Sequence, residues 1–232
     1  EGNIGTERII NMLDVVNDNL VVEEKGIYSI EKFLIARRLM YWQVYLHKTV
    51  ISAENMLINV LKRAKELINR GEKIYATPSL SIFLKHNYSL QDFNTQAQLL
   101  DDFSQLDDFE IHVCLKNWRN DTDFVLSNLA EMIVNRQLLK IKVQNVAFTP
   151  AEIEYFLKKM QNKYKINKEE SEYFVFTNKV SNSTYNIERS TINILMKNGN
   201  VIDITSASDQ FNIEALSKKV EKYFLCYPQT IL

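Results

Sequence analysis

Apolar and polar positions along the first third of the chain predict one long helix. Forty-four consecutive residues, from Ile27 to Arg70, contain no glycine and no proline. Such a run is typical of uninterrupted helix, and Gly71 is well suited to end it. We expect this helix to bend near residues 47–49, because a run of this length rarely stays straight.

The remaining segments predict short helices first and strands later. A hairpin is expected over residues 14–26, where apolar residues flank a turn-like Asn-Asp-Asn. Thr149-Pro150 is a strong helix start, and Asn198-Gly199 is a strong hairpin signal. Helices are expected over residues 6–13, 79–86, 122–133, 150–163 and 208–224; a further helix begins at residue 89, and another runs through residue 118. Strands are expected over residues 139–143, 173–180, 191–196 and 201–205.

This order of elements predicts a mostly α fold with a smaller C-terminal α+β lobe that contains antiparallel strands. We expect a helical region over residues 1–137 and the α+β lobe over residues 138–232. The sequence shows no internal repeat.

Composition restricts the possible partners. Hydrophobic residues make up 46% of the chain and charged residues 25%, which is typical of a globular protein. The net charge of −1 favours neither nucleic acid nor an anionic membrane, so any anion site must be local. No segment reaches the ~18 apolar residues of a membrane span. The two cysteines show no metal-ligand spacing, and we expect reduced thiols in a cytoplasmic protein.

The long helix carries the strongest chemical signal. At about 100° per residue, Arg37, Tyr41, Tyr45 and Lys48 fall within roughly an 80° arc. Two cations and two phenol rings on one face suit a phosphorylated ligand that bears a ring. The alternative is that the cations are solvated while the aromatic residues fill a core.

Other sequence features carry less chemistry. The three histidines lie outside any metal-binding pattern, and the glycines form no phosphate-cradling loop. Two acidic pairs, Asp101-Asp102 and Asp107-Asp108, could bind a hard cation or simply begin helices. Arg136 and Lys140 form a second basic cluster at a predicted helix-to-strand junction, where a solvated edge strand is the alternative.

The segment YSIEKFLIARRLMYWQVYLHKTVISAENML resembles the HD-domain phosphohydrolases that hydrolyse deoxynucleoside triphosphates, including bacterial relatives of the sterile-alpha-motif HD-domain enzyme. The shared pattern is an Arg, a Tyr eight residues later, and His-Lys after one more residue, here Arg37, Tyr45 and His47-Lys48. The segment NRQLLK, which ends at Lys140, is similar to a family segment near an activator nucleotide. The resemblance is strongest over residues 27–60 and diffuse after residue 145.

The resemblance implies roles for individual residues. Arg37 would contact substrate phosphates, and Tyr45 with Tyr41 would pack on the sugar or base. An effector-nucleotide site at a subunit interface of a homo-oligomer would take three cations: Lys48, Arg136 and Lys140.

The chain departs from the family in one respect. The metal-binding pattern of a His, a His-Asp pair and a later Asp is absent, and residues 1–13 resemble the piece that follows it. The resemblance therefore implies the C-terminal part of such an enzyme, inactive alone, with no cofactor of its own and a divalent metal held by a preceding HD segment. Two alternatives stay open: a non-catalytic helical interaction module, and an HD enzyme for another phosphorylated substrate.

Overall fold

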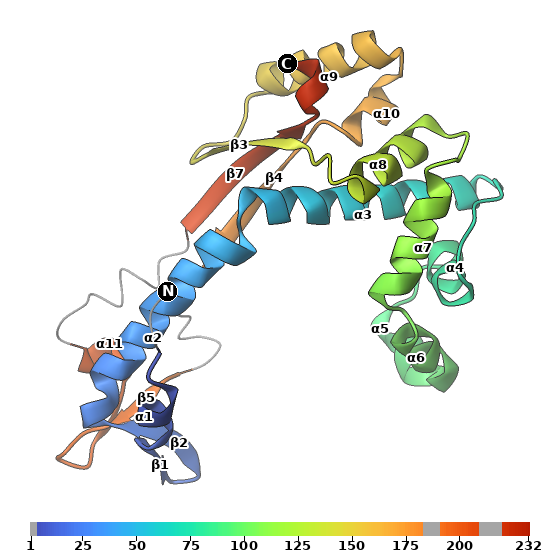
Figure 1. The fold of residues 1–232 in the computed structure, drawn as a ribbon. Coiled ribbons are helices and arrows are strands. Elements are labelled where there is room, and N and C mark those ends of the chain that lie inside the picture. The colour runs from blue at the N-terminus through green and yellow to red at the C-terminus, as the bar shows by residue number, and fades with distance from the viewer. Residues whose placement is uncertain (1–3, 183–190, 209–219) are drawn as a thin grey trace. The chain divides into compact units, whose positions relative to one another are not determined.

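The computed structural model describes residues 4–182, 191–208 and 220–232, and the chain divides into two compact units. Unit 1 contains Glu1–His47 and Lys179–Lys222, and unit 2 contains Lys48–Asn178 and Tyr223–Leu232. The mostly helical class with a smaller α+β part is confirmed (Figure 1). The domain boundary expected after residue 137 lies within unit 2 and stays a prediction.

Unit 1 is a small mixed sheet packed on a helix. Its four strands have the order β1-β2-β5-β6; β2 and β5 are parallel, and the two other pairs are antiparallel. Asn17 and Asp18 both have positive φ, as the tight turn of the β1–β2 hairpin requires. The elements are α1 (Thr6–Ile10), β1 (Leu13–Val16), β2 (Asn19–Glu23), the 3-10 helix η1 (Glu24–Gly26), α2 (Ile27–Met40), the π-helix η2 (Tyr41–Tyr45), β5 (Asn193–Leu195), β6 (Val201–Asp203) and α11 (Ile204–Ala207).

The long helical run is divided into three parts. Helix α2 passes into η2, in which the Leu46 N–H donates to the Tyr41 carbonyl at 2.7 Å, a spacing of five residues. Leu46 then leaves helical geometry, and α3 (Lys48–Asn69) begins after His47. The expected irregularity near residues 47–49 is confirmed, although a short π-helix and a break replace a simple bend.

Unit 2 is built on α3. Helix α8 packs against both α3 and α7, and their buried faces contribute Met56, Val60, Trp118 and Leu129. The sheet has the order β3-β7-β4, and β3 pairs with β7 in antiparallel register. The remaining elements are α4 (Pro78–Lys85), α5 (Leu90–Thr95), α6 (Ala97–Ser104), α7 (Asp108–Trp118), α8 (Phe124–Val134), β3 (Lys140–Gln144), α9 (Pro150–Tyr164), α10 (Lys168–Glu172), β4 (Phe176–Asn182), β7 (Val220–Tyr227) and the 3-10 helix η3 (Gln229–Ile231).

The prediction of a helix over residues 208–224 is wrong at its C-terminal end. Val220 to Phe224 belong to strand β7, whereas residues 209–219 lie outside the described residues. Phe224, Leu225 and Cys226 are all buried on both faces of this central strand. Val220 to Tyr223 are half-buried, and Val220 and Phe224 stand four residues apart, which is helical spacing. The local pattern therefore favoured a helix, whereas pairing with the distant strand β3 makes this segment a strand.

A buried guanidinium holds the centre of unit 2 together. Arg63 on α3 is 5% exposed and donates two hydrogen bonds to Asp123, at 3.0 and 2.6 Å. It also bonds Glu66 at 2.9 Å, and Glu66 accepts from the Tyr173 hydroxyl at 2.7 Å. Asp123 in turn caps α8 by accepting from the Leu126 N–H. One cation thus joins α3, the start of α8 and the segment after α10.

This network controls the ionisation of both carboxylates. Burial raises the pKa of Asp123, but the hydrogen bonds from Arg63 and Leu126 outweigh it, so the pKa is lowered from 3.8. Burial likewise raises the pKa of Glu66, and the bonds from Tyr173 and Arg63 outweigh it, so that pKa is lowered from 4.5. Folding lowers the pKa of Asp123 and of Glu66, so each ionised carboxylate stabilises the folded state. This stabilisation is fully present at a pH above the pKa of the unfolded chain, and it is lost as the pH falls through the lower pKa of the folded state.

We expect Arg63→Met to lower the free energy of unfolding by about 3–5 kcal/mol at neutral pH, because it leaves a buried carboxylate without its partner. Below pH 4.5 the loss should shrink, since protonation removes the uncompensated charge. Urea unfolding between pH 3 and 7 measures both effects. Lys62→Met, an exposed neighbour on the same helix, is the matched control. Equal stability of Arg63→Met and wild type would contradict the assigned role.

Gly26, at the start of α2, provides a second test. A Cβ at this position would lie 2.6 Å from Cγ1 of Val22 and 3.2 Å from Sδ of Met12. Val22 is buried in the unit 1 core with Ile27 and Ile194. We expect Gly26→Ala to destabilise unit 1 by about 1–3 kcal/mol through overpacking. Thermal unfolding measures this loss of stability. Gly199→Ala is the comparison, because an added Cβ there meets no atom within 4 Å and its φ of +84° tests backbone strain alone.

Candidate functional site

The structure brings Arg37, Tyr41 and Tyr45 into one contiguous row. The Cζ of Arg37 lies 5.7 Å from the centroid of the Tyr41 ring, and the Tyr41 and Tyr45 rings are 5.2 Å apart. Arg37 is exposed, Tyr41 is half-buried and Tyr45 is 54% exposed. We call these three residues the Arg–Tyr row. Arg37 and Tyr45 are thus open to solvent, whereas Tyr41 is partly covered, and the role of this face stays a prediction.

The π-helix places the two tyrosines. The tilted contact between the Tyr41 and Tyr45 rings spans η2, and the contact between Arg37 and Tyr41 crosses the junction of α2 and η2. π-Helical turns are rare and frequently lie at functional sites. Lys48 follows the break at Leu46 and His47, so the helical repeat that grouped it with Arg37 does not run through to it.

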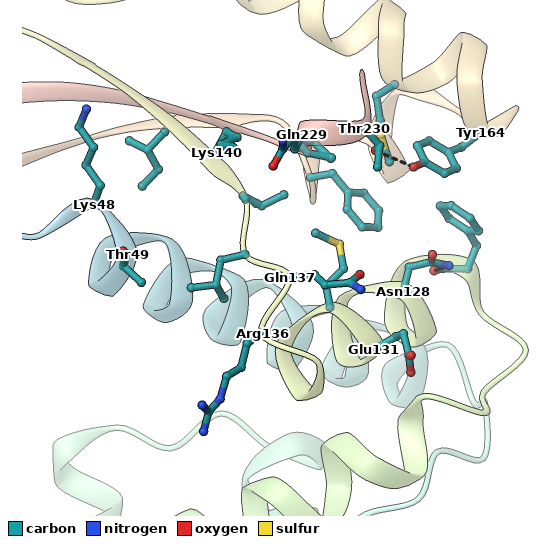
Figure 2. A pocket seen from close by; sticks show the side chains of 18 residues that line it. Lys48, Thr49, Asn128, Glu131, Arg136, Gln137, Lys140, Tyr164, Gln229 and Thr230 are labelled. Carbon is teal, nitrogen blue, oxygen red and sulfur yellow. Dashed lines mark hydrogen bonds between the residues drawn. The ribbon is translucent and has the colours of Figure 1, made fainter. Parts of the chain in front are cut away.

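Unit 2 contains a cavity of about 1040 Å³ that all three predicted effector residues line. Lys48 is the first residue of α3, Lys140 is the first residue of β3, and Arg136 follows the end of α8 (Figure 2). The ammonium of Lys48 extends toward the side on which β3 lies, whereas the Arg136 guanidinium points the opposite way. The cavity therefore offers cations at separate places on its rim.

Aromatic side chains form the other end of the cavity. Phe124 contacts the ring of Tyr164 at 5.6 Å and that of Phe174 at 6.0 Å. The Tyr164 hydroxyl shares a hydrogen bond of 2.8 Å with Thr230 (Figure 2). These residues come from distant parts of the chain, and sequence reasoning missed them because no spacing rule relates them. A cavity with an aromatic wall and a cationic rim suits a ligand with a ring and an anion.

Arg136 has an unusual backbone conformation for a residue with a side chain. Its φ is +55°, in the left-handed region where glycine is preferred. Its N–H donates to the Ile133 carbonyl at 3.1 Å, and the Gln137 N–H donates to the Met132 carbonyl at 2.8 Å. This pair of bonds ends α8 as a Schellman motif, whose positive-φ residue is usually glycine. An arginine at this position lowers the stability of the fold relative to glycine, and none of these backbone contacts requires its side chain.

One carboxylate also lies on the rim. Glu131 lines the cavity and is paired with Arg119. The hydrogen bond from Arg119 lowers the pKa of Glu131, so this group stays ionised. Because Arg119 compensates its charge, the net potential of the rim is set by Lys48, Arg136 and Lys140.

Metal and thiol chemistry find no support in the described residues. Within residues 4–182, 191–208 and 220–232, no three His, Cys, Asp or Glu side chains gather to hold a metal ion. Cys114 and Cys226 are free and buried, and burial raises the pKa of the Cys226 thiol to about 12. Such a thiol is inert as a nucleophile.

Comparison with known proteins indicates the class to which this architecture is related. Residues 4–77 match the family model described as HD associated region. A crystal structure of a phosphohydrolase from Bacteroides thetaiotaomicron superposes with a TM-score of 0.89 at 44% identity, covering 98% of this chain and 56% of that one. These findings support an HD-type phosphohydrolase family. No helix in the described part of the chain is both long and apolar enough to cross a membrane.

Two further proteins are similar to this chain. The uncharacterized protein YwfO of Bacillus subtilis is 28% identical over 239 residues, which is all of this chain and 52% of that protein. A hypothetical protein from Aquifex aeolicus shares the fold with a TM-score of 0.55 at 19% identity, over 97% of this chain and 48% of that one. The chain thus spans about half the length of the relatives it matches.

The backbone at Arg136 yields a prediction that separates stability from function. We expect Arg136→Gly to raise the free energy of unfolding by about 0.5–1 kcal/mol, because glycine adopts this φ without strain. Arg136→Ala removes the same charge but keeps the strain, so its stability should stay near that of wild type. Urea unfolding of both variants measures this. A loss of stability in Arg136→Gly would show that the guanidinium holds the fold.

Proposed function

We propose that this chain is the C-terminal part of a cytoplasmic HD-type enzyme that hydrolyses deoxynucleoside triphosphates. It supplies one wall of the nucleotide pocket, an effector-nucleotide site and surface for a homo-oligomer. The Arg–Tyr row is the single observation that carries the proposal. A guanidinium binds phosphate oxygens with two parallel hydrogen bonds, and exposed phenol rings pack on a sugar or base.

We assign each residue of the row the role that the family resemblance implies, and the order of the side chains supports this assignment. Arg37 stands at one end and holds the triphosphate, while Tyr45 at the other end lies along the sugar or base. Tyr41 lies between them and contacts both. A ligand held at two ends keeps one orientation, which is the contribution to catalysis that positioning residues make.

The effector site uses the cavity of unit 2. Lys48 and Lys140 provide point charges for phosphate, and the Phe124, Tyr164 and Phe174 rings suit a base. Arg136, directed away from Lys48, suits a phosphate or a partner subunit on the outer side of the rim. The strained backbone at Arg136 supports a functional reason for keeping an arginine there.

A divalent metal would polarise a phosphate in this reaction and activate the attacking water. Because the described residues provide no cluster of ligands for it, we assign its ligands to an HD segment outside this chain. This chain alone should therefore bind nucleotide without hydrolysing it. Release of triphosphate by the chain alone with Mg²⁺ or Mn²⁺ would contradict the assignment.

Calorimetric titration with dGTP and dATP tests the binding role. We expect Arg37→Ala to weaken binding by about 10- to 100-fold, since a hydrogen bond to a charged group contributes about 1.5–3 kcal/mol. Arg37→Lys should recover only part of the loss, because lysine lacks the fork of donors. Arg8→Ala, an exposed arginine of the same unit, is the matched control and should bind as wild type.

The same titration distinguishes the alternatives. No binding of any nucleotide by the wild-type chain would favour a helical interaction module. Tighter binding of a nucleoside monophosphate than of a triphosphate would favour an HD enzyme with another phosphorylated substrate. Lys140→Ala, with Lys62→Ala as control, reports on the cavity independently of Arg37.

A further inference from the structure

One segment of unit 2 has a charge unlike that of the rest of the chain. Residues 86–115, which we call the acidic arm, contain six carboxylates and neither lysine nor arginine. At the chain average, about four cations would be expected in thirty residues. The arm comprises α5, α6 and most of α7, and Figure 1 shows α5 and α6 at the end of α7 away from α8. Its carboxylates are Asp92, Asp101, Asp102, Asp107, Asp108 and Glu110.

Helix capping explains only part of this charge. Asp92 forms a capping box with Ser89, and Asp107 accepts from the Glu110 N–H at the start of α7. Among the described residues, no carboxylate of the arm takes part in an ion pair. Asp101, Asp107 and Asp108 are exposed, whereas Asp92, Asp102 and Glu110 are half-buried, so the arm presents negative charge to solvent chiefly through the three exposed carboxylates.

Large apolar side chains are exposed on the same arm. On α7, Phe109 is 80% exposed and Val113 is 42% exposed, four residues apart and hence on one face. On α6, Leu100 and Phe103 are 58% and 53% exposed and three residues apart. Leu90 on α5 is 79% exposed. Exposed apolar residues gathered in this way mark interaction sites more often than singly scattered ones do.

The rings of the arm also contact the preceding helix. Phe83 of α4 lies against Tyr88, Phe93 and Phe103, with ring centroids 5.6–6.4 Å apart, and Phe103 keeps 53% of its surface exposed. Leu99 on the inner face of α6 is 4% exposed, whereas Leu100 beside it points out. Leu99 therefore faces the inside of the arm, and Leu100 is exposed to solvent.

We propose that the acidic arm is a docking surface for a basic amphipathic helix of a protein partner. Such a helix would place its apolar stripe on the Phe109–Val113 and Leu100–Phe103 pairs, and its lysines or arginines would meet the surrounding carboxylates. The charge of the arm repels nucleic acid and anionic membranes, which leaves a cationic polypeptide as its complement. None of its residues lines the cavity of unit 2 or belongs to the Arg–Tyr row.

A designed probe tests the proposal with the intact chain. The probe is a fluorescein-labelled helical peptide of about 18 residues, roughly five turns, with leucine on one face and lysine on the other. A second peptide carries glutamate in place of every lysine. Fluorescence anisotropy should show binding of the lysine peptide, weaker binding at high salt, and no binding of the glutamate peptide.

Variants locate the binding. Phe109→Ser should weaken binding of the lysine peptide at least tenfold, because it removes the most exposed anchor. The triple variant Asp101→Asn, Asp102→Asn, Asp108→Asn should reduce the dependence on salt. Val146→Ser, at a 67% exposed position outside the arm, is the matched control and should bind as wild type. Circular dichroism melts establish that each variant is folded.

Three outcomes would overturn the proposal. Equal binding of both peptides would remove the electrostatic argument. Unchanged affinity in folded Phe109→Ser would place the peptide elsewhere on the chain. Sedimentation experiments supply the third outcome. If the wild-type chain is a dimer and Phe109→Ser is a monomer, this surface binds a second copy of the chain.

Discussion

The contact between Arg63 and Asp123 is the constraint on which the geometry of unit 2 depends. A buried guanidinium is stable only when its donors are satisfied, and here the acceptors are Asp123 at the start of α8 and Glu66 on α3. Tyr173, after α10, donates to Glu66 and so joins the same network. Because Asp123 also caps α8, the ion pair fixes where that helix begins and how it lies on α3. Lys48 begins α3 and Arg136 follows α8, so the positions of these cavity cations follow indirectly from a salt bridge far from either residue in sequence.

The division of the long helical run is the second organising feature. One continuous helix would have carried Arg37 and Lys48 on one face, but the π-helix and the break after it end the regular repeat. The Arg–Tyr row lies where α2 passes into η2 and does not need the repeat to continue, because its contacts join residues four apart. Each compact unit therefore holds its own group of cations and rings, and each group can be tested by itself.

Stability and chemistry oppose each other at two places in unit 2. Arg136 occupies a backbone position that glycine would fill with less strain, and the acidic arm exposes large apolar side chains beside uncompensated carboxylates. Neither arrangement benefits an isolated fold. Local departures of this kind concentrate where a protein binds something, which is why both places support proposals about ligands or partners.

The sequence by itself determined the helix-rich class, the hairpins, most helix starts and the adjacency of Arg37, Tyr41 and Tyr45. These features depend on interactions between residues a few positions apart, such as capping, turn chemistry and helical spacing. Only the tertiary structure decided that Val220 to Phe224 form part of a central strand and that Arg63 pairs with Asp123. It likewise decided that Phe124, Tyr164 and Phe174 line one cavity with Lys48 and Lys140. Those contacts join residues tens of positions apart, and no local pattern encodes them because their free energy arises only when distant segments pack.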